Sequence, residues 1–308
     1  MNHYLSIDVG GTGIKYALMN DQAEILEKGE VPTPKNDLEG FLNVIVAIYE
    51  KYADQNLQAL AMSAPGKIDS DRSYFYTSGA LMYLDGVNLA DRLKDRIPLE
   101  ISVLNDAKSA ALAELWKGSM KGKKSGIVMT LGTGIGGALI IDGKLWRGNT
   151  NCAGEFSGIP MRWDQPTAME GQDWWCSKYC TKALTTSYAL KKGIDPSSIN
   201  GKDYFEQVNQ NDEVAVACLD EFCDSLATGL LGMQLILDVE HISIGGGISR
   251  QKVLIDTLNR KVKELFDRIP SQVPASRMEI SACQFSNDAN LIGALYFYLV
   301  EHGLLNEA

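Results

Sequence analysis

Two glycine-rich bends, each joining a pair of β-rich runs, constrain the fold of this 308-residue chain more than any other feature. The first bend, Gly10-Gly11-Thr12-Gly13, joins the runs 4–9 and 14–19. The second, Gly132-Thr133-Gly134-Ile135-Gly136-Gly137, joins the runs 126–131 and 138–141. Short β-rich runs joined by glycine predict hairpins. This is a weak internal repeat, and we expect each half of the chain to contribute one hairpin.

The remaining segments alternate between strand and helix patterns. Buried strands are predicted over 57–62, 101–104 and 241–244, and helices over 38–52, 91–96, 107–116, 214–238, 255–266 and 290–301. This alternation favours an α/β fold. The stretch 117–126 is rich in Gly, Lys and Ser and predicts an exposed connection between two lobes. We therefore predict a small lobe of residues 1–117 plus 289–308, onto which the last helix packs, and a larger lobe of residues 118–288.

Composition limits the partners of the chain. A hydrophobic content of 45% is enough for a large core in two lobes. The net charge of −10 argues against nucleic acid, because a phosphate backbone is bound by clustered Lys and Arg. No apolar run approaches the roughly 18 residues of a membrane span, and no signal-type segment is present. Six cysteines are too sparse for a disulfide framework, so we expect a reduced, cytoplasmic protein.

The two bends are suited to bind phosphate, since backbone N–H groups approach a phosphate closely where no Cβ intervenes. Asp8 adds a carboxylate that would hold magnesium through water, and Thr12 and Thr133 would donate hydroxyls. Lys15 either neutralises charge or points to solvent. The alternative is two hairpins whose glycines only permit the turn, but the third segment, Gly245-Gly246-Gly247, counts against it. The pattern is neither a Walker loop nor a Rossmann fingerprint.

Asn105 and Asp106 stand where a strand ends and a helix begins. Such a pair is expected to cap the helix, because Asn and Asp satisfy free N–H groups there. The functional alternative is that Asp106 takes the proton from an attacking hydroxyl while Asn105 holds an adjacent one. Phosphoryl transfer requires mostly positioning and charge stabilisation, so one carboxylate and a clamped triphosphate can suffice.

These motifs follow the order found in the ROK family of sugar kinases, and the chain resembles that family from one end to the other. Any one segment is weak, but the ordered set is specific. The matching segments are Asp8-Val9-Gly10-Gly11-Thr12, Ala64-Pro65-Gly66-Lys67-Ile68-Asp69, Asn105-Asp106-Ala107 with Ala110-Ala111, Gly132-Thr133-Gly134-Ile135-Gly136-Gly137, Ala153-Gly154-Glu155, Gly245-Gly246-Gly247-Ile248 and Ile292-Gly293-Ala294.

The resemblance implies a two-lobed actin-like ATPase (ribonuclease-H-like) fold with an interlobe cleft, and ATP and Mg²⁺ as cofactors. It also implies the roles of individual residues. Asp106 would be the catalytic base, and Gly66, Asn105, Asp106 and Glu155 would contact the sugar, although Glu155 could be only a solvated loop carboxylate. A homodimer is plausible from the family alone. The cofactor-binding residues would be Asp8 (magnesium, through water), Gly10, Gly11, Thr12, Lys15, Gly132, Thr133, Gly134, Gly136, Gly245 and Gly246.

The chain also departs from the family. Many members carry a zinc module with a histidine three residues after the glutamate, where this chain has Gly158. Cys176 and Cys180 alone are a poor four-ligand site, so we predict ordinary helix-borne cysteines and no structural zinc. A lysine is frequent where Gly13 stands, and an Asn-containing segment where Ser78-Gly79-Ala80-Leu81 stands. The aromatic residues of the replaced region either stack on a second sugar ring or pack in the core; they are Trp163, Trp174, Trp175 and, elsewhere, Tyr83.

We weigh four functions against these features. The first is an ATP-dependent kinase for the 6-hydroxyl of a hexose or a β-glucoside such as cellobiose, because members without the zinc module include β-glucoside kinases. The second is a kinase for an amino sugar such as N-acetylmannosamine. A sugar-sensing regulator is disfavoured, because the first strand begins at residue 4 and leaves no room for a helix-turn-helix domain. A catalytically inactive sugar-binding module is disfavoured by Asp106 and the intact bends.

Overall fold

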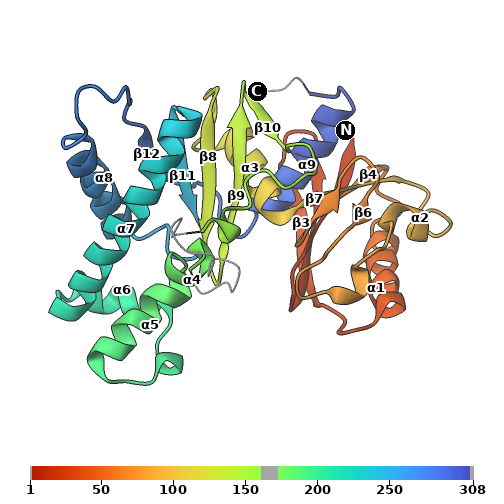
Figure 1. Cartoon of the computed structure of the whole chain (residues 1–308). Helices are drawn as coiled ribbons and strands as arrows, with labels where there is room; N and C mark the ends of the chain where they lie inside the picture. The colour runs from red at the N-terminus through yellow and green to blue at the C-terminus, as the bar shows by residue number, and fades with distance from the viewer. Residues whose placement is uncertain (1, 161–172, 306–308) are drawn as a thin grey trace. The chain divides into compact units, whose positions relative to one another are not determined.

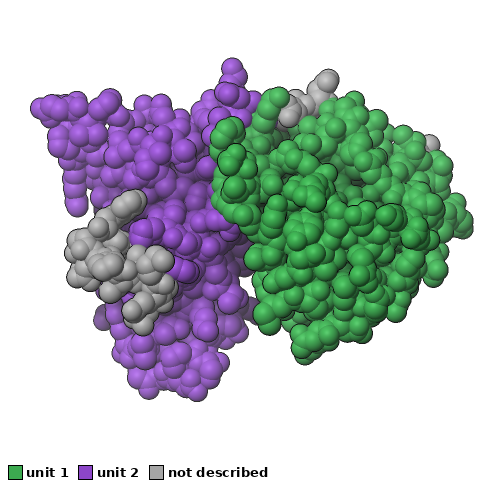
Figure 2. Space-filling model, turned by 45° about the vertical axis from the view of Figure 1, so that its right-hand side comes forward, with its two compact units in different colours: residues 1–121, 144–153, 287–308 green, residues 122–143, 154–286 purple. Residues whose placement is uncertain are grey.

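The computed structural model describes residues 2–160 and 173–305. The chain divides into two compact units (Figure 2). Unit 1 comprises Met1–Lys121, Lys144–Ala153 and Asn287–Ala308, and unit 2 comprises Gly122–Gly143 and Gly154–Ser286. The lobe boundaries expected from the sequence, after residues 117 and 288, stay a prediction.

Unit 1 is built on a five-stranded sheet with the order β3-β2-β1-β4-β7 (Figure 1). Strands β1 to β3 form an antiparallel meander, and β4 and β7 run parallel to β1. A two-stranded ribbon, β5 and β6, follows β4. The elements are β1 (His3–Val9), β2 (Gly13–Asn20), β3 (Ile25–Pro32), α1 (Leu38–Glu50), β4 (Leu57–Ala64), β5 (Ile68–Asp69), β6 (Tyr74–Phe75), η1 (Met82–Leu84), α2 (Leu89–Leu93), β7 (Glu100–Asn105), α3 (Asp106–Lys117), β10 (Lys144–Trp146) and α9 (Ala289–Glu301).

Side chains of β1 alternate between the two faces of this sheet, as expected for a strand. Leu5 and Ile7 are fully buried in the core that α1 covers. On the other face, the Ser6 hydroxyl donates to the carbonyl of Leu291 at 2.6 Å, and the ring of Tyr4 contacts that of Tyr298. The even-numbered residues of β1 therefore face α9, as Asp8 also does.

Unit 2 holds most of the second sheet, whose order is β10-β9-β8-β11-β12. Its core is formed by apolar residues of β8 and β11 together with those of α5 to α8. The elements are β8 (Gly126–Leu131), β9 (Ile135–Ile141), η2 (Phe156–Gly158), α4 (Trp175–Lys178), α5 (Thr181–Lys192), η4 (Pro196–Ser198), α6 (Gly201–Asn209), α7 (Glu213–Leu237), β11 (His241–Gly245), α8 (Lys252–Phe266) and β12 (Glu279–Ala282).

The two sheets repeat one topology. In each, a glycine bend joins two antiparallel strands, and two further strands run parallel to the first of them. The predicted hairpins and internal repeat are thereby confirmed. Because parallel strands end at the same edge of a sheet, β1, β4 and β7 deliver Gly10, Gly66 and Asp106 to one edge. In unit 2, β8 and β11 likewise deliver Gly132 and Gly246.

No helix within residues 2–160 and 173–305 is both long enough and apolar enough to cross a membrane.

Helices α3 and α9 cross at a point where no side chain fits. A Cβ added to Gly293 of α9 would lie 1.6 Å from the carbonyl oxygen of Ser109 in α3. Asp106 is the first residue of α3, and Asn290 lies in the first turn of α9. The crossing therefore fixes the helices that carry both residues.

We predict that Gly293→Ala destabilises the protein by about 3 kcal/mol or more, because the added methyl group overpacks a backbone contact. The measurement is urea unfolding at neutral pH. Gly232→Ala is the matched control, since a Cβ at this exposed position of α7 meets nothing within 4 Å. That variant should gain about 0.5–1 kcal/mol from helix propensity. Equal stability of the two variants would contradict the close approach of α3 and α9.

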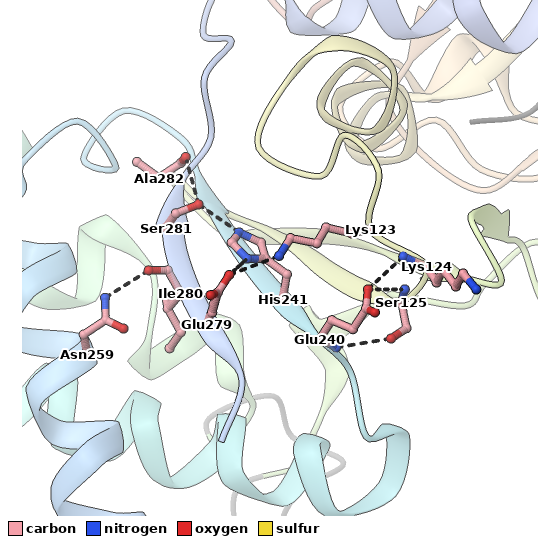
Figure 3. Close-up of polar contacts among 10 residues, drawn as sticks. All are labelled: Lys123, Lys124, Ser125, Glu240, His241, Asn259, Glu279, Ile280, Ser281 and Ala282. Atoms are coloured by element: carbon pink, nitrogen blue, oxygen red, sulfur yellow. Dashed lines mark hydrogen bonds and ion pairs between the residues drawn. The ribbon is translucent and has the colours of Figure 1, made fainter. Parts of the chain in front are cut away.

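Two carboxylates of unit 2 bind residues 123–125, the segment that leads into β8 (Figure 3). Glu279 accepts from Lys123 Nζ at 3.1 Å. Glu240 accepts from the backbone N–H groups of Lys124 and Ser125, at 2.8 and 3.4 Å. Its own N–H donates to the Ser125 hydroxyl at 3.2 Å. The first residues of unit 2 are thus tied to the beginnings of β11 and β12.

His241, at the start of β11, is 5% exposed inside this cluster. Its Nε2 lies 2.9 Å from the Ser281 hydroxyl, and its Nδ1 lies 3.5 Å from a carboxylate oxygen of Glu279 (Figure 3). Burial lowers the pKa of His241, and the charge of Lys123 lowers it further. The carboxylates of Glu279 and Glu240 oppose the shift without cancelling it. His241 is therefore held in its neutral form.

We predict that His241 makes the protein less stable as the pH falls from its ordinary pKa of 6.5 towards its lower folded pKa. In this window the unfolded chain binds a proton that the folded chain does not, so stability rises with pH. In His241→Gln the loss of unfolding free energy between pH 7.5 and pH 5.5 should be smaller than in the parent protein.

His302 provides a comparison in which the pKa shift has the opposite sign. Burial lowers the pKa of His302, but the hydrogen bonds to Glu100 and to the Tyr298 carbonyl outweigh burial, so its pKa is raised in the folded protein. Its protonation stabilises the folded state at acidic pH, so His302→Gln should lose more stability on acidification than the parent. The same response in both variants would contradict the assignment.

Candidate active site

The first bend, in unit 1, is fixed by three hydrogen bonds. The Gly10 N–H donates to the Gly13 carbonyl at 3.0 Å, and Thr33 binds the carbonyls of Gly10 and Thr12 with its hydroxyl and its N–H, at 2.7 and 3.1 Å. A Cβ on Gly10 would lie 2.9 Å from the Gly13 oxygen, so the fold itself needs this glycine. A Cβ on Gly11 would approach nothing closer than 3.7 Å. Gly11 is thus not required by packing, and its part in phosphate binding stays a prediction.

Asp8 is half-buried beside this bend. Asn290 Nδ2 donates to its Oδ1 at 3.0 Å, and Lys15, also half-buried, is its cross-strand neighbour on β2. Burial raises the pKa of Asp8, and Asn290 and Lys15 lower it without cancelling the shift. A carboxylate oxygen is a ligand that Mg²⁺ prefers, so the chemistry of Asp8 fits the predicted magnesium, whose binding there stays a prediction.

Asn105 occupies the N-cap of α3, and both ends of its side chain are used. Its Oδ1 accepts from the Lys108 N–H at 3.2 Å, and its Nδ2 donates to the Gly66 carbonyl at 3.0 Å. Asp106, the next residue, accepts from the Ala107 N–H at 2.7 Å and is half-buried. The capping function expected of the pair therefore belongs to Asn105. Asp106 is the first residue of α3 and so stands at the positive end of the helix dipole.

Gly66 must be glycine. Its φ is +103°, and a Cβ there would lie 2.1 Å from the Thr77 carbonyl oxygen. The segment after β4 therefore lies against residues 77–78 on one side and Asn105 on the other. Adjacent strands are about 4.8 Å apart, so the ends of β1 and β7, which flank β4, are separated by about 10 Å. Unit 1 thus gathers Asp8, Gly66 and Asp106 at one sheet edge.

The second bend, in unit 2, is a tight loop of Gly132, Thr133 and Gly134. The Gly132 N–H donates to the Gly134 carbonyl at 2.9 Å, and Thr133 and Gly134 are exposed at the tip. A Cβ on Gly134 would meet nothing within 4 Å. Gly136 lies within β9, opposite Thr130. Packing therefore does not require a glycine at position 134, just as it does not require one at position 11.

The third glycine segment lies against the end of β8. Gly246 has a φ of +91°, and a Cβ there would lie 2.3 Å from the Leu131 carbonyl oxygen. Gly245 is also tight, because its Cβ would lie 3.1 Å from Cys283 Sγ. Gly246 is therefore required by the fold, whereas an alanine at position 245 would need only a small shift of its neighbours. The two glycines place the following residues, Gly247 and Ile248, beside the second bend.

A cavity of about 800 Å³ in unit 2 unites these segments. The second bend and the third segment form one part of its wall, and the N-termini of α5 and α6 form another. Thr181, Lys182, Asn200 and Lys202 are among its lining residues and were not found from the sequence. The Asn200-x-x-Asp203 capping box marks the start of α6, but no local pattern links it to the glycine bends.

Comparison with known proteins agrees with this geometry. The model of the ROK family matches residues 4–301. The chain belongs to the ROK family. It is 29% identical to the glucokinase of Halalkalibacterium halodurans, over 94% of this chain and 93% of that protein. It is also 29% identical to a β-glucoside kinase of Listeria monocytogenes, over 96% of this chain and 97% of that protein.

A solved relative has the same fold. The ROK glucokinase of Streptomyces griseus, in complex with glucose and AMPPNP, aligns with a TM-score of 0.79 at 26% identity, covering 96% of this chain and 98% of that one. The predicted α/β, actin-like ATPase fold is confirmed. These relatives also confirm the predicted enzyme class, a sugar phosphotransferase.

Other residues singled out from the ROK motifs lie in unit 2. Glu155 is exposed and immediately precedes η2. Asp106 belongs to unit 1, so a joint sugar contact of Glu155 and Asp106 stays a prediction. Trp175 is 5% exposed and packs edge-on against Tyr179, so it is a core residue. Trp163 lies outside the described residues.

The two cysteines near the position of the ROK zinc module have separate surroundings. Cys176 is half-buried in α4, whereas Cys180 is buried and is the N-cap of α5, where its sulfur accepts from the Ala183 N–H at 3.4 Å. Within residues 2–160 and 173–305, no three His, Cys, Asp or Glu side chains are grouped to hold a metal. The absence of zinc stays a prediction, because residues 161–172 are not described.

We predict that Gly134→Ala leaves folding intact but weakens ATP binding. The open surroundings accept a methyl group, and the loss of chain entropy adds up to about 1 kcal/mol of stability. The methyl group would keep a phosphate from the bend. Loss of one charge-assisted hydrogen bond, about 1.5–3 kcal/mol, corresponds to a rise of about ten- to a hundred-fold in the KM for ATP.

Steady-state kinetics and thermal unfolding of the same preparations test this. Gly246→Ala is the contrasting variant, and it should fail to fold stably because of its left-handed φ and the 2.3 Å approach. Gly232→Ala should match the parent in the KM for ATP and unfold at a slightly higher temperature. An unchanged KM for ATP in Gly134→Ala would remove the tip of the second bend from the nucleotide site.

Proposed function

We propose that this ROK protein transfers the γ-phosphoryl group of ATP, with Mg²⁺, to the 6-hydroxyl of a hexose or a β-glucoside. The proposal is supported by its similarity to a glucokinase and a β-glucoside kinase over nearly the whole chain. It is also supported by the AMPPNP and glucose bound in its structural relative.

The observation that carries the proposal is the division of labour between Asn105 and Asp106. Asn105 accepts from the Lys108 N–H as the N-cap and donates to the Gly66 carbonyl, whereas Asp106 accepts from the neighbouring Ala107 N–H. Asp106 follows the end of β7, two strands from the bend that follows β1. In the proposed reaction it accepts the proton of the sugar 6-hydroxyl as the oxygen attacks the γ-phosphorus.

The nucleotide is proposed to bind through the two glycine bends and the cavity of unit 2. The exposed tips at Gly11 and Gly134 would offer backbone N–H groups to the phosphates, with the hydroxyls of Thr12 and Thr133 beside them. Lys182 and Lys202 line the cavity and would add positive charge. Asp8 would hold Mg²⁺ through water, and the metal, when bound, offsets the negative charge of the phosphates.

The proposed acceptor class is supported by the similarity of this chain to a glucokinase and to a β-glucoside kinase, each at 29% identity.

A substrate panel tests the proposal. ADP release is measured with Mg²⁺ and ATP for glucose, N-acetylmannosamine, N-acetylglucosamine, cellobiose and an aryl β-glucoside. Turnover with glucose or a β-glucoside is expected. Turnover with amino sugars alone would replace the acceptor class, and sugar-independent ATP hydrolysis alone would overturn the kinase assignment.

We predict that Asp106→Asn lowers kcat by about 10²–10⁴-fold, the usual contribution of a general base. The variant should fold and bind ATP, because the Asn oxygen can still accept from the Ala107 N–H. Asp91→Asn, a first-turn residue of α2, is the control and should keep full activity. Turnover of Asp106→Asn at the parent's rate would exclude Asp106 as the base.

A further inference from the structure

The second glycine bend is tied to a helix by one residue, Thr181. The Thr181 N–H donates to the Gly132 carbonyl at 2.9 Å, and its hydroxyl donates to the Leu131 carbonyl at 3.1 Å. Both acceptors stand immediately before the exposed tip of the bend. Thr181 therefore holds this loop with both its side chain and its backbone.

The helix terminus supplies the backbone donor. The first N–H groups of an α-helix have no partner within the helix, so the N–H of Thr181, the first residue of α5, is available to the bend. Cys180 satisfies the Ala183 N–H at 3.4 Å. The terminus is thus shared between a thiol cap and the glycine loop.

The helix is a firm anchor for this contact. Leu184 and Tyr188 on α5 are 2% and 3% exposed and belong to the core of unit 2. Gly132 is also held from its other side, since its N–H donates to the Gly134 carbonyl. Both polar backbone groups of Gly132 are therefore occupied, and the loop's orientation is set by α5.

We propose that Thr181 is a positioning residue for the nucleotide phosphates, which fixes the second bend with its N–H groups directed for binding. This inference rests on the proposed kinase function. Binding to a loop that is already ordered avoids an entropic cost, so freeing the loop should weaken ATP binding and leave the acceptor unaffected.

The chain allows the two hydrogen bonds to be removed one after the other. Thr181→Val removes the hydroxyl and keeps the shape. Thr181→Pro removes the N–H as well, at the one helical position where proline is well tolerated. Cys180 already has the extended backbone that a residue before proline requires, with φ −89° and ψ 164°. Helix α5 should therefore survive in Thr181→Pro, while the bend loses both bonds.

The test is steady-state kinetics with Mg·ATP and the best sugar from the panel. In Thr181→Val the KM for ATP should rise about three- to ten-fold, the usual effect of one neutral hydrogen bond. In Thr181→Pro it should rise further, and Thr181→Ser should restore the parent value. The KM for the sugar should stay unchanged throughout. Thr228→Val is the control. It removes a hydroxyl that donates only to the Asp224 backbone carbonyl within α7, at 3.0 Å, and so should leave the KM for ATP unchanged.

Calorimetric binding of Mg·AMPPNP separates this inference from the proposed function. If no sugar is phosphorylated by the parent protein, the kinase proposal fails, while the order of AMPPNP affinities still tests Thr181. Parent-like ATP KM and AMPPNP affinity in both Thr181→Val and Thr181→Pro would overturn the inference. So would equal rises in the KM for ATP and the KM for sugar, which indicate a general structural effect.

Discussion

The site depends on places where backbone meets backbone with no side chain between them. Gly66 packs on Thr77, Gly246 packs on Leu131, and Gly293 packs on Ser109, each at a distance that excludes a Cβ. These contacts bring the ends of neighbouring strands, and the helices that follow or cover them, within reach of one another. A different group of glycines, including Gly11 and Gly134, has open surroundings. The first group is explained by packing, whereas packing does not explain the second.

The even-numbered face of β1 links the core to the chemistry. Tyr4 and Ser6 are bound to α9, and the same alternation turns Asp8 towards Asn290. As a result, the Asp8 carboxylate is partly removed from water, and this burial raises its pKa. Such a group is less stable ionised in the empty protein than in a complex with a cation. The burial of this carboxylate thus costs some stability, as is common for carboxylates that serve a function.

Much of this arrangement could be predicted from local sequence. Glycine between β-rich runs predicted both hairpins, and helical spacing predicted α1, α3, α7, α8 and α9 to within a few residues. Asn105 and Asp106 were identified as a pair, but only the structure shows which of them is the N-cap, because the Lys108 N–H donates to the side chain of Asn105.

Other features depend on contacts between distant segments. Asn290 reaches Asp8 across 282 positions, and Thr181 reaches Leu131 across 50. Neither residue has a local pattern that reveals its partner, because an Asn in a first turn and a Thr at a helix start are ordinary. The strand order of the two sheets is likewise set by which distant strands pair. The periodicity of the sequence gives no information about that pairing.

The thiol at the start of α5 has a consequence for local unfolding. Sulfur is a weak hydrogen-bond acceptor, so Cys180 caps less firmly than serine or aspartate would. The first turn of α5 then relies on the Gly132 loop as much as the loop relies on it. Fraying of this turn is therefore expected to loosen the loop as well, so that amide exchange in the two segments is coupled. Nucleotide in the cavity would slow that exchange for both segments together.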